Sequence, residues 1–179
     1  ESTDKGSGAR FNTGKPNLAL IPLEIIAAWM NMERGIRMSS LVEALACLGE
    51  FQTRKNHRTA RRTLLLLISE LGADWDACAR VFDYGREKYA EWNWAKGMPW
   101  SAVIASCARH LLAMSRGEVN DPESGLSHTG HAMCNVVMLW TYCETYLEGD
   151  DRPPAGLFMP AIRSDRGIPE DGIVTVYLG

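Results

Sequence analysis

Apolar side chains recur at helical spacing along most of the chain, and the body of the chain contains no series of alternating strand-like segments. The spacing predicts an all-α fold, with five or six helices in a bundle-like arrangement. The helices are expected at about residues 22–35, 40–51, 59–71, 75–89, 100–116 and 128–147.

Several helix ends carry recognisable signals. Ser40 and Glu43 form a capping-box pattern, and Asp74 and Ser127 each precede a helical run as candidate N-caps. Gly72 is expected to stop the helix before it. These signals make the helix limits more specific than periodicity alone would.

The two ends of the chain lack this periodicity. Residues 1–16 are expected to form an extended N-terminal arm, and residues 151–179 an extended C-terminal tail with one short strand-like run at 173–177. Residues 17–150 are expected to form the helical domain. We expect the C-terminal tail to pack on the domain or on a neighbouring subunit.

The composition and charge of the chain limit the binding partners and the cellular location that can be expected for it. The 179 residues are 46% hydrophobic and 23% charged, which is ordinary for a single globular domain. A net charge of -3 gives no general attraction to nucleic acid or to an anionic membrane, so any phosphate recognition is expected to be local. The five cysteines show no C-x-x-C spacing, and they are expected to be reduced thiols of a cytoplasmic protein.

The rarest chemistry lies between residues 109 and 135. Three of the four histidines, His110, His128 and His131, fall there, together with Glu118 and Asp121. A single histidine on a helix is usually an ordinary core or surface residue. The combination of imidazoles and carboxylates favours a divalent-metal site.

Two basic segments allow alternative interpretations. Residues 10–16 combine two cations, an aromatic ring, an amide and a glycine, and they could be a plain linker or a clamp for phosphates and a base. The run at 54–62 is most often a solvated face, with phosphate or partner contact as the less common alternative.

Four stretches together resemble the N-terminal domain family of bacteriophage dATP/dGTP diphosphohydrolases, relatives of the all-α MazG-like nucleotide pyrophosphohydrolases. They are residues 8–16 with 20–24, residues 81–89, residues 93–97, and the segment from Arg109 to Asn135. About forty residues, 34–76, are atypical of the family, and the tail after 150 is unmatched. The MazG-like motif pairs Glu-x-x-Glu with Glu-x-x-Asp. Here only Glu118-x-x-Asp121 is found, so histidines are candidates to replace the first pair.

The resemblance implies hydrolysis of dGTP and dATP to the monophosphate and pyrophosphate, in the remodelling of phage nucleotide pools or the synthesis of modified DNA. It implies a divalent cofactor, Mg²⁺ or Mn²⁺ with Co²⁺ as a further candidate, and a location in the host cytoplasm. The candidate metal ligands are Glu118, Asp121, His110, His128 and His131, of which Glu118, His110 and His131 are also the candidate catalytic residues. The candidate substrate-binding residues are Arg10, Phe11, Asn12, Lys15, Lys88, Asn93, Trp94, Lys96, Arg109 and Asn135, with Trp92 as another possible base-stacking ring.

Two other functions are alternatives for this sequence. A histidine-aspartate phosphohydrolase would release triphosphate or phosphate from the same substrates, but it needs an adjacent His-Asp pair that this sequence lacks. A non-catalytic nucleotide-binding or assembly protein of a phage would account for the basic run. A homo-oligomer, a dimer or tetramer, is expected in either case, without direct nucleic-acid binding.

Overall fold

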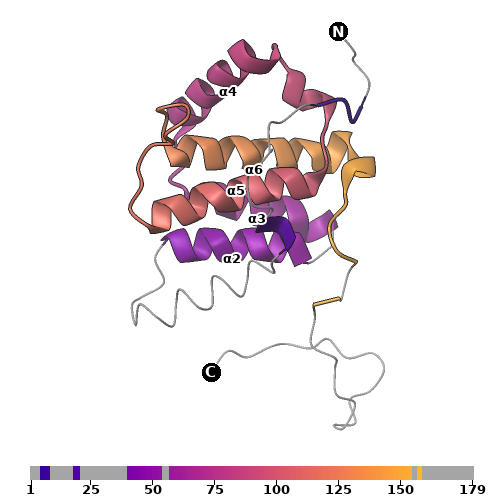
Figure 1. The fold of residues 1–179 in the computed structure, drawn as a ribbon. Coiled ribbons are helices and arrows are strands. Elements are labelled where there is room, and N and C mark those ends of the chain that lie inside the picture. Colours follow the sequence, from indigo (N-terminus) through magenta and orange to yellow (C-terminus); the bar gives the residue numbers. More distant parts are fainter. Residues whose placement is uncertain (1–4, 9–17, 21–39, 54–56, 155–156, 159–179) are drawn as a thin grey trace, which may run out of the picture.

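The computed structural model describes residues 5–8, 18–20, 40–53, 57–154 and 157–158. This part of the chain contains five α-helices and no strand (Figure 1). The all-α prediction is therefore confirmed, while the helix expected at 22–35, the strand-like run at 173–177 and most of both arms lie outside the described residues. The α-helices are α2 (Ser40–Thr53), α3 (His57–Glu70), α4 (Trp75–Tyr89), α5 (Trp100–Ser115) and α6 (His128–Thr145).

Short 3-10 helices complete the described fold: η1 (Leu18–Leu20), η2 (Asn93–Lys96) and η3 (Leu147–Gly149). Two predicted N-caps are confirmed. The Asp74 side chain accepts a hydrogen bond from the Ala77 N–H, and the Ser127 side chain accepts one from the Gly130 N–H. In the described part of the chain, no helix combines the length and apolar character needed to cross a membrane.

Helix α6 lies at the centre of the arrangement. It runs beside α5 as the second half of an antiparallel hairpin, with α4 on one side and α2 and α3 on the other (Figure 1). The approach of α4 is close at Gly130, where an added Cβ would lie 2.6 Å from the backbone oxygen of Ala77. A side chain at this position would therefore force the two helices apart.

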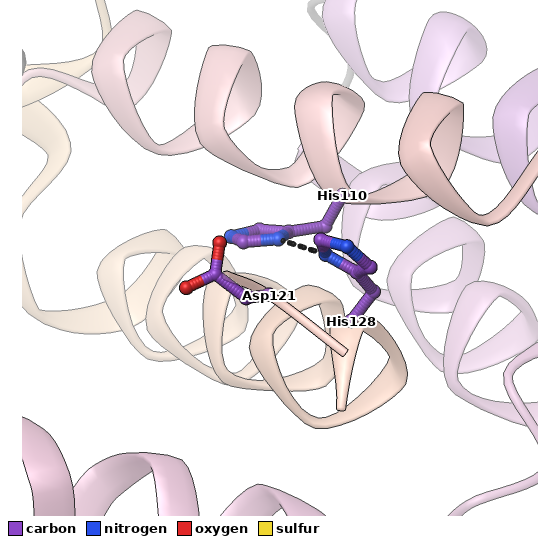
Figure 2. Close-up of side chains that lie close together, drawn as sticks. All are labelled: His110, Asp121 and His128. Atoms are coloured by element: carbon purple, nitrogen blue, oxygen red, sulfur yellow. Dashed lines mark hydrogen bonds between the residues drawn. The ribbon is translucent and has the colours of Figure 1, made fainter. Parts of the chain in front are cut away.

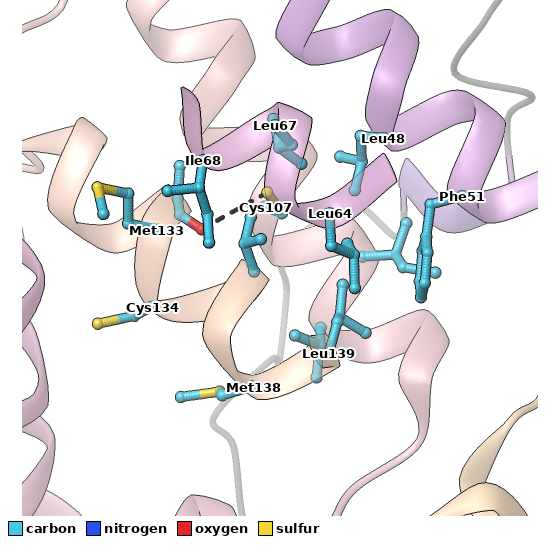
Figure 3. Close-up of a cluster of buried hydrophobic side chains, with 14 of the residues drawn as sticks. Leu48, Phe51, Leu64, Leu67, Ile68, Cys107, Met133, Cys134, Met138 and Leu139 are labelled. Carbon is cyan, nitrogen blue, oxygen red and sulfur yellow. Dashed lines mark hydrogen bonds between the residues drawn. The ribbon is translucent and has the colours of Figure 1, made fainter. Parts of the chain in front are cut away.

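A continuous apolar core joins these helices. Leu64 and Leu67 of α3 and Leu139 of α6 are fully buried (Figure 3). Helices α2 and α3 thus supply a wall of the core, although they lie within the segment expected to be atypical of the family. Tyr142 of α6 is also buried, and its hydroxyl donates a hydrogen bond to the carbonyl of Trp94, which ties η2 to α6.

The chain after α6 is fastened by a buried arginine. The Arg152 side chain is fully buried, and its guanidinium donates to both carboxylate oxygens of Asp150, at 2.8 and 2.9 Å, and to the carbonyl of Phe51 at 2.7 Å. The same guanidinium lies 4.4 Å from the Phe51 ring centroid and 4.8 Å from that of Trp100. It therefore links the chain after α6 to α2 and α5.

Replacing Arg152 by alanine is expected to lower the free energy of unfolding by about 3–5 kcal/mol, because the Asp150 carboxylate would remain buried without its partner. Urea denaturation followed by circular dichroism measures this loss. Arg86→Ala is the matched control, since Arg86 pairs with Asp83 at the surface, and it is expected to cost at most about 0.5 kcal/mol. Equal losses in the two variants would contradict this account of the Arg152 cluster.

Candidate functional site

The loop between α5 and α6 is shaped around Asp121. The Asp121 N–H donates to the carbonyl of Leu126, and the Asp121 carbonyl accepts from the N–H of Gly125, each at 2.8 Å. Gly125 has φ +71, a backbone conformation that glycine adopts without strain. The Asp121 side chain also accepts a hydrogen bond from the Ser124 N–H, three residues on, at 3.0 Å. Residues 121–125 therefore form a closed turn.

This turn brings a carboxylate to two histidines from neighbouring helices. His110 comes from α5 and His128 from the start of α6, and their Nδ1 atoms lie 2.9 Å apart. One candidate ligand atom from each of His110, Asp121 and His128 lies within 4.8 Å of the other two (Figure 2). The helix pair and its connecting loop thus assemble a group that is spread over 19 residues of sequence.

His131 lies beside this group. Its ring stacks on that of His110, with centroids 4.6 Å apart and an interplanar angle of 12°. Its Nε2 is 2.7 Å from the Ser124 hydroxyl and 3.9 Å from Asp121 Oδ2. His131 is therefore in contact with the three-residue group through two of its members.

His128 has an unpartnered nitrogen. The residue is only 3% exposed, and its Nε2 is buried without a hydrogen-bond partner. Glu118 Oε2 lies 3.8 Å from this nitrogen, while the other oxygen of Glu118 accepts a hydrogen bond from Arg116 at 2.8 Å. Glu118 thus approaches His128 at Nε2, whereas His110 approaches it at Nδ1.

Asp121 carries the negative charge of the group. Burial alone would raise the pKa of its carboxyl, but the two hydrogen bonds from Ser124 and the nearby imidazoles of His131 and His110 lower that pKa below its ordinary value. The carboxylate is accordingly ionised at neutral pH, which suits a cation ligand.

A cavity of about 570 Å³ opens next to these groups. Its lining includes His110, Asp121 and His131 and also the aromatic side chains of Phe82, Trp92 and Trp94. Among the rings, Trp94 lies 5.1 Å from Phe82 and 6.2 Å from Trp92, measured between centroids. The lining of the cavity therefore combines ionisable groups with aromatic rings.

The mouth of the cavity includes a strained connection between α4 and η2. Ala90 and Trp92 both have positive φ, at +83 and +58, which is uncommon for residues other than glycine. The side chain of Trp92 is 66% exposed and lines the cavity. Backbone strain of this kind concentrates at ligand sites.

The structure gathers many of the residues singled out from the sequence. Those that line the cavity are Lys88, Asn93, Trp94, Arg109, His110, Asp121, His131 and Asn135. Glu118, Lys96 and His128 do not line it, although His128 Nδ1 lies 2.9 Å from that of His110. Arg10, Phe11, Asn12 and Lys15 lie outside the described residues, so their assigned roles stay predictions.

Other contributors were not evident from the sequence. Tyr84 and Tyr89 line the cavity from α4. Glu123, also in the lining, forms an ion pair of 2.5 Å with Lys88, which raises the pKa of the Lys88 ammonium. Ser124 forms hydrogen bonds with both Asp121 and His131. The only signal in the sequence for this role was the position of Ser124 three residues after Asp121.

The donor set fits a divalent cation. Two imidazoles and one ionised carboxylate are ligands that Mn²⁺ and similar ions accept, whereas Mg²⁺ prefers oxygen ligands. The unpartnered Nε2 of His128 is also consistent with this interpretation, because an imidazole ligand commonly has a carboxylate near its second nitrogen, and Glu118 occupies that position. The fold and the site together define an all-α protein with a candidate cation-binding cavity.

Comparison with known proteins identifies the group to which this chain belongs. Residues 52–152 match the family described as dATP/dGTP diphosphohydrolase, N-terminal, and the chain is a member of that family. A dATP/dGTP diphosphohydrolase of Salmonella phage PMBT28 is 29% identical over 89 residues, which cover 50% of this chain. The chain matches 30% of the length of that relative. No solved structure matches the chain.

Titration of the purified protein with Co²⁺, followed by its visible absorption, is expected to show binding that depends on the three-residue group. Asp121→Asn retains the turn but removes the charge, and His128→Ala removes a ligand. Each is expected to weaken binding by more than about 100-fold, since loss of supporting residues alone costs about 10- to 100-fold. Glu144→Gln, at an exposed ion pair with Arg61, is the control. Unchanged affinity in both site variants would rule out this cation site.

Proposed function

We propose that this protein hydrolyses dGTP and dATP to the monophosphate and pyrophosphate, in phage nucleotide metabolism. The observation that carries the proposal is that one cavity is lined both by two members of the group His110, Asp121 and His128 and by several aromatic rings, in a member of this family. A nucleoside triphosphate offers a partner for each kind of group, a charged polyphosphate and an apolar base.

The cation would be held by His110, Asp121 and His128, and Mn²⁺ suits this mixed donor set better than Mg²⁺. Such an ion supplies two kinds of chemistry when bound: it neutralises charge on the polyphosphate and makes a coordinated water more acidic. His131, which stacks on His110 and lines the cavity, would accept a proton from an attacking water.

The polyphosphate would be bound by the cationic side chains of the cavity. Arg109 lines it from α5, and burial lowers the pKa of its guanidinium without removing its charge at neutral pH. Lys88 lines it from α4 and is paired with Glu123, so an incoming phosphate would compete with that carboxylate. Asn135, buried and donating to the carbonyl of His131, supports the same wall.

The base would lie against the rings of Phe82, Trp92 and Trp94. Stacking on aromatic side chains is available to any base and is worth about 1–3 kcal/mol. It explains binding of a purine without explaining a preference between guanine and adenine. Base preference would have to come from polar contacts to the edges of the ring.

We also propose that the protein forms a homo-oligomer. Leu65 and Leu66 of α3 are 54% and 49% exposed, which gives α3 an apolar outer face within the described residues. Light scattering of the purified protein measures the oligomeric state directly, and a monomer would contradict this part of the proposal.

The first test is product analysis. Purified protein is incubated with each deoxynucleoside triphosphate and Mn²⁺ or Mg²⁺, and the products are separated by ion exchange. Deoxynucleoside monophosphate with pyrophosphate is expected, fastest with dGTP or dATP, and Asp121→Asn is expected to be inactive. Nucleoside with triphosphate would instead indicate a histidine-aspartate type of phosphohydrolase. No product with either metal would leave a binding or assembly role.

Trp92→Ala tests the placement of the base. Loss of one stacking ring is expected to raise KM by about 5- to 100-fold with little change in kcat, because the ring touches the base and not the reacting phosphate. Trp75→Ala is the matched control: Trp75 is 55% exposed at the start of α4 and is absent from the cavity lining. Equal KM values in the wild type and Trp92→Ala would show that the base lies elsewhere.

A further inference from the structure

The hydroxyl of Ser124 lies between two ionisable groups of the site. Its Oγ is 2.7 Å from His131 Nε2 and 3.0 Å from Asp121 Oδ2. The N–H of Leu126 donates to the same Oγ at 3.2 Å, and the N–H of Ser124 itself donates to Asp121 Oδ2 at 3.0 Å. Ser124 thus has three polar neighbours for one hydroxyl group.

The hydrogen-bonding capacity of that hydroxyl decides the direction of each bond. A serine hydroxyl has one hydrogen to donate and two lone pairs that accept. The Leu126 N–H occupies one lone pair. The Asp121 carboxylate is ionised and can only accept, so it receives the hydroxyl hydrogen. The remaining lone pair faces His131 Nε2, which must therefore carry the hydrogen of that bond.

The opposite arrangement leaves an unfavourable contact. If Ser124 donated its hydrogen to His131, a lone pair of Oγ would face the lone pairs of Asp121 Oδ2 at 3.0 Å. The carboxylate would also lose one of its two hydrogen bonds from Ser124. Repulsion between these oxygens disfavours the Nδ1–H form of His131 relative to the Nε2–H form.

We propose that Ser124 is a positioning residue that holds neutral His131 as its Nε2–H tautomer and fixes the orientation of Asp121. The lone pair of the imidazole then lies on Nδ1, which is the atom that receives a proton during turnover. Asp121 Oδ2 accepts both hydrogen bonds from Ser124, so Oδ1 is the oxygen that binds a cation. The consequence for turnover rests on the hydrolase function proposed above, whereas the tautomer itself does not.

The tautomer of His131 can be measured without substrate or metal. Histidine labelled with ¹⁵N gives two-bond and three-bond correlations whose pattern distinguishes Nε2–H from Nδ1–H. Spectra are recorded at about pH 8, above the ordinary histidine pKa of about 6.5, and His131→Gln assigns the signals among the four histidines. The wild type and Ser124→Thr, which keeps a hydroxyl, are expected to show the Nε2–H pattern.

Ser124→Ala is expected to lose that pattern in favour of a mixture or of the Nδ1–H form. Ser115→Ala is the control, since the hydroxyl of Ser115 donates to the carbonyl of Leu112 in α5, and the variant should match the wild type in every spectrum. An Nδ1–H pattern in the wild type, or an unchanged Nε2–H pattern in Ser124→Ala, would overturn the proposal.

A second readout connects the tautomer to catalysis. Ser124→Ala is expected to lower kcat by about 10- to 100-fold, as for other residues that support a site, and Ser124→Thr to recover most of this loss. If the wild type hydrolyses no deoxynucleoside triphosphate, the hydrolase function fails, yet the spectra still decide the role of Ser124. Full activity in Ser124→Ala with an altered tautomer would overturn the catalytic consequence alone.

Discussion

The close antiparallel packing of α5 and α6 is the constraint on which the rest of the site depends. It brings His110 to within hydrogen-bond distance of His128 and stacks it on His131, although these residues are 18 and 21 positions apart. Helix α6 can take this central place because Gly130 lets α4 approach its other side. A shift of α6 would therefore change both the imidazole group and the cavity wall at once.

The connecting loop adds the negative charge that two helices alone would lack. Asp121 is held by its own turn rather than by either helix, and Ser124 bonds its side chain from within that turn. The loop also supplies Glu123, whose ion pair with Lys88 joins it to α4. The loop thus contributes Asp121 and Glu123 to the cavity lining, while the aromatic rings of the lining come from α4, η2 and the connection between them.

Much of this could be predicted from the sequence, for physical reasons. Helical periodicity and the caps Asp74 and Ser127 are local signals, and both caps appear in the structure. The combination of imidazoles and carboxylates predicted a cation site within residues 109–135, and the structure brings His110, Asp121 and His128 of that segment together. The roles of individual residues were harder to predict. Glu118 and Asp121 share a motif, but of the two only Asp121 lines the cavity, and that difference depends on the loop conformation. Ser124 could not be identified, because its role exists only through bonds to two other residues.

The proposed function requires one cavity to bind a cation beside its imidazole and carboxylate groups and a purine against its aromatic rings. A crystal structure with Mn²⁺ and a non-hydrolysable analogue of dGTP, with the anomalous signal of manganese recorded, tests both halves together. The account predicts an anomalous peak within coordination distance of His110, Asp121 and His128, and the base stacked near Trp92 and Trp94. A manganese peak away from these three residues, or a base outside the cavity, would contradict it.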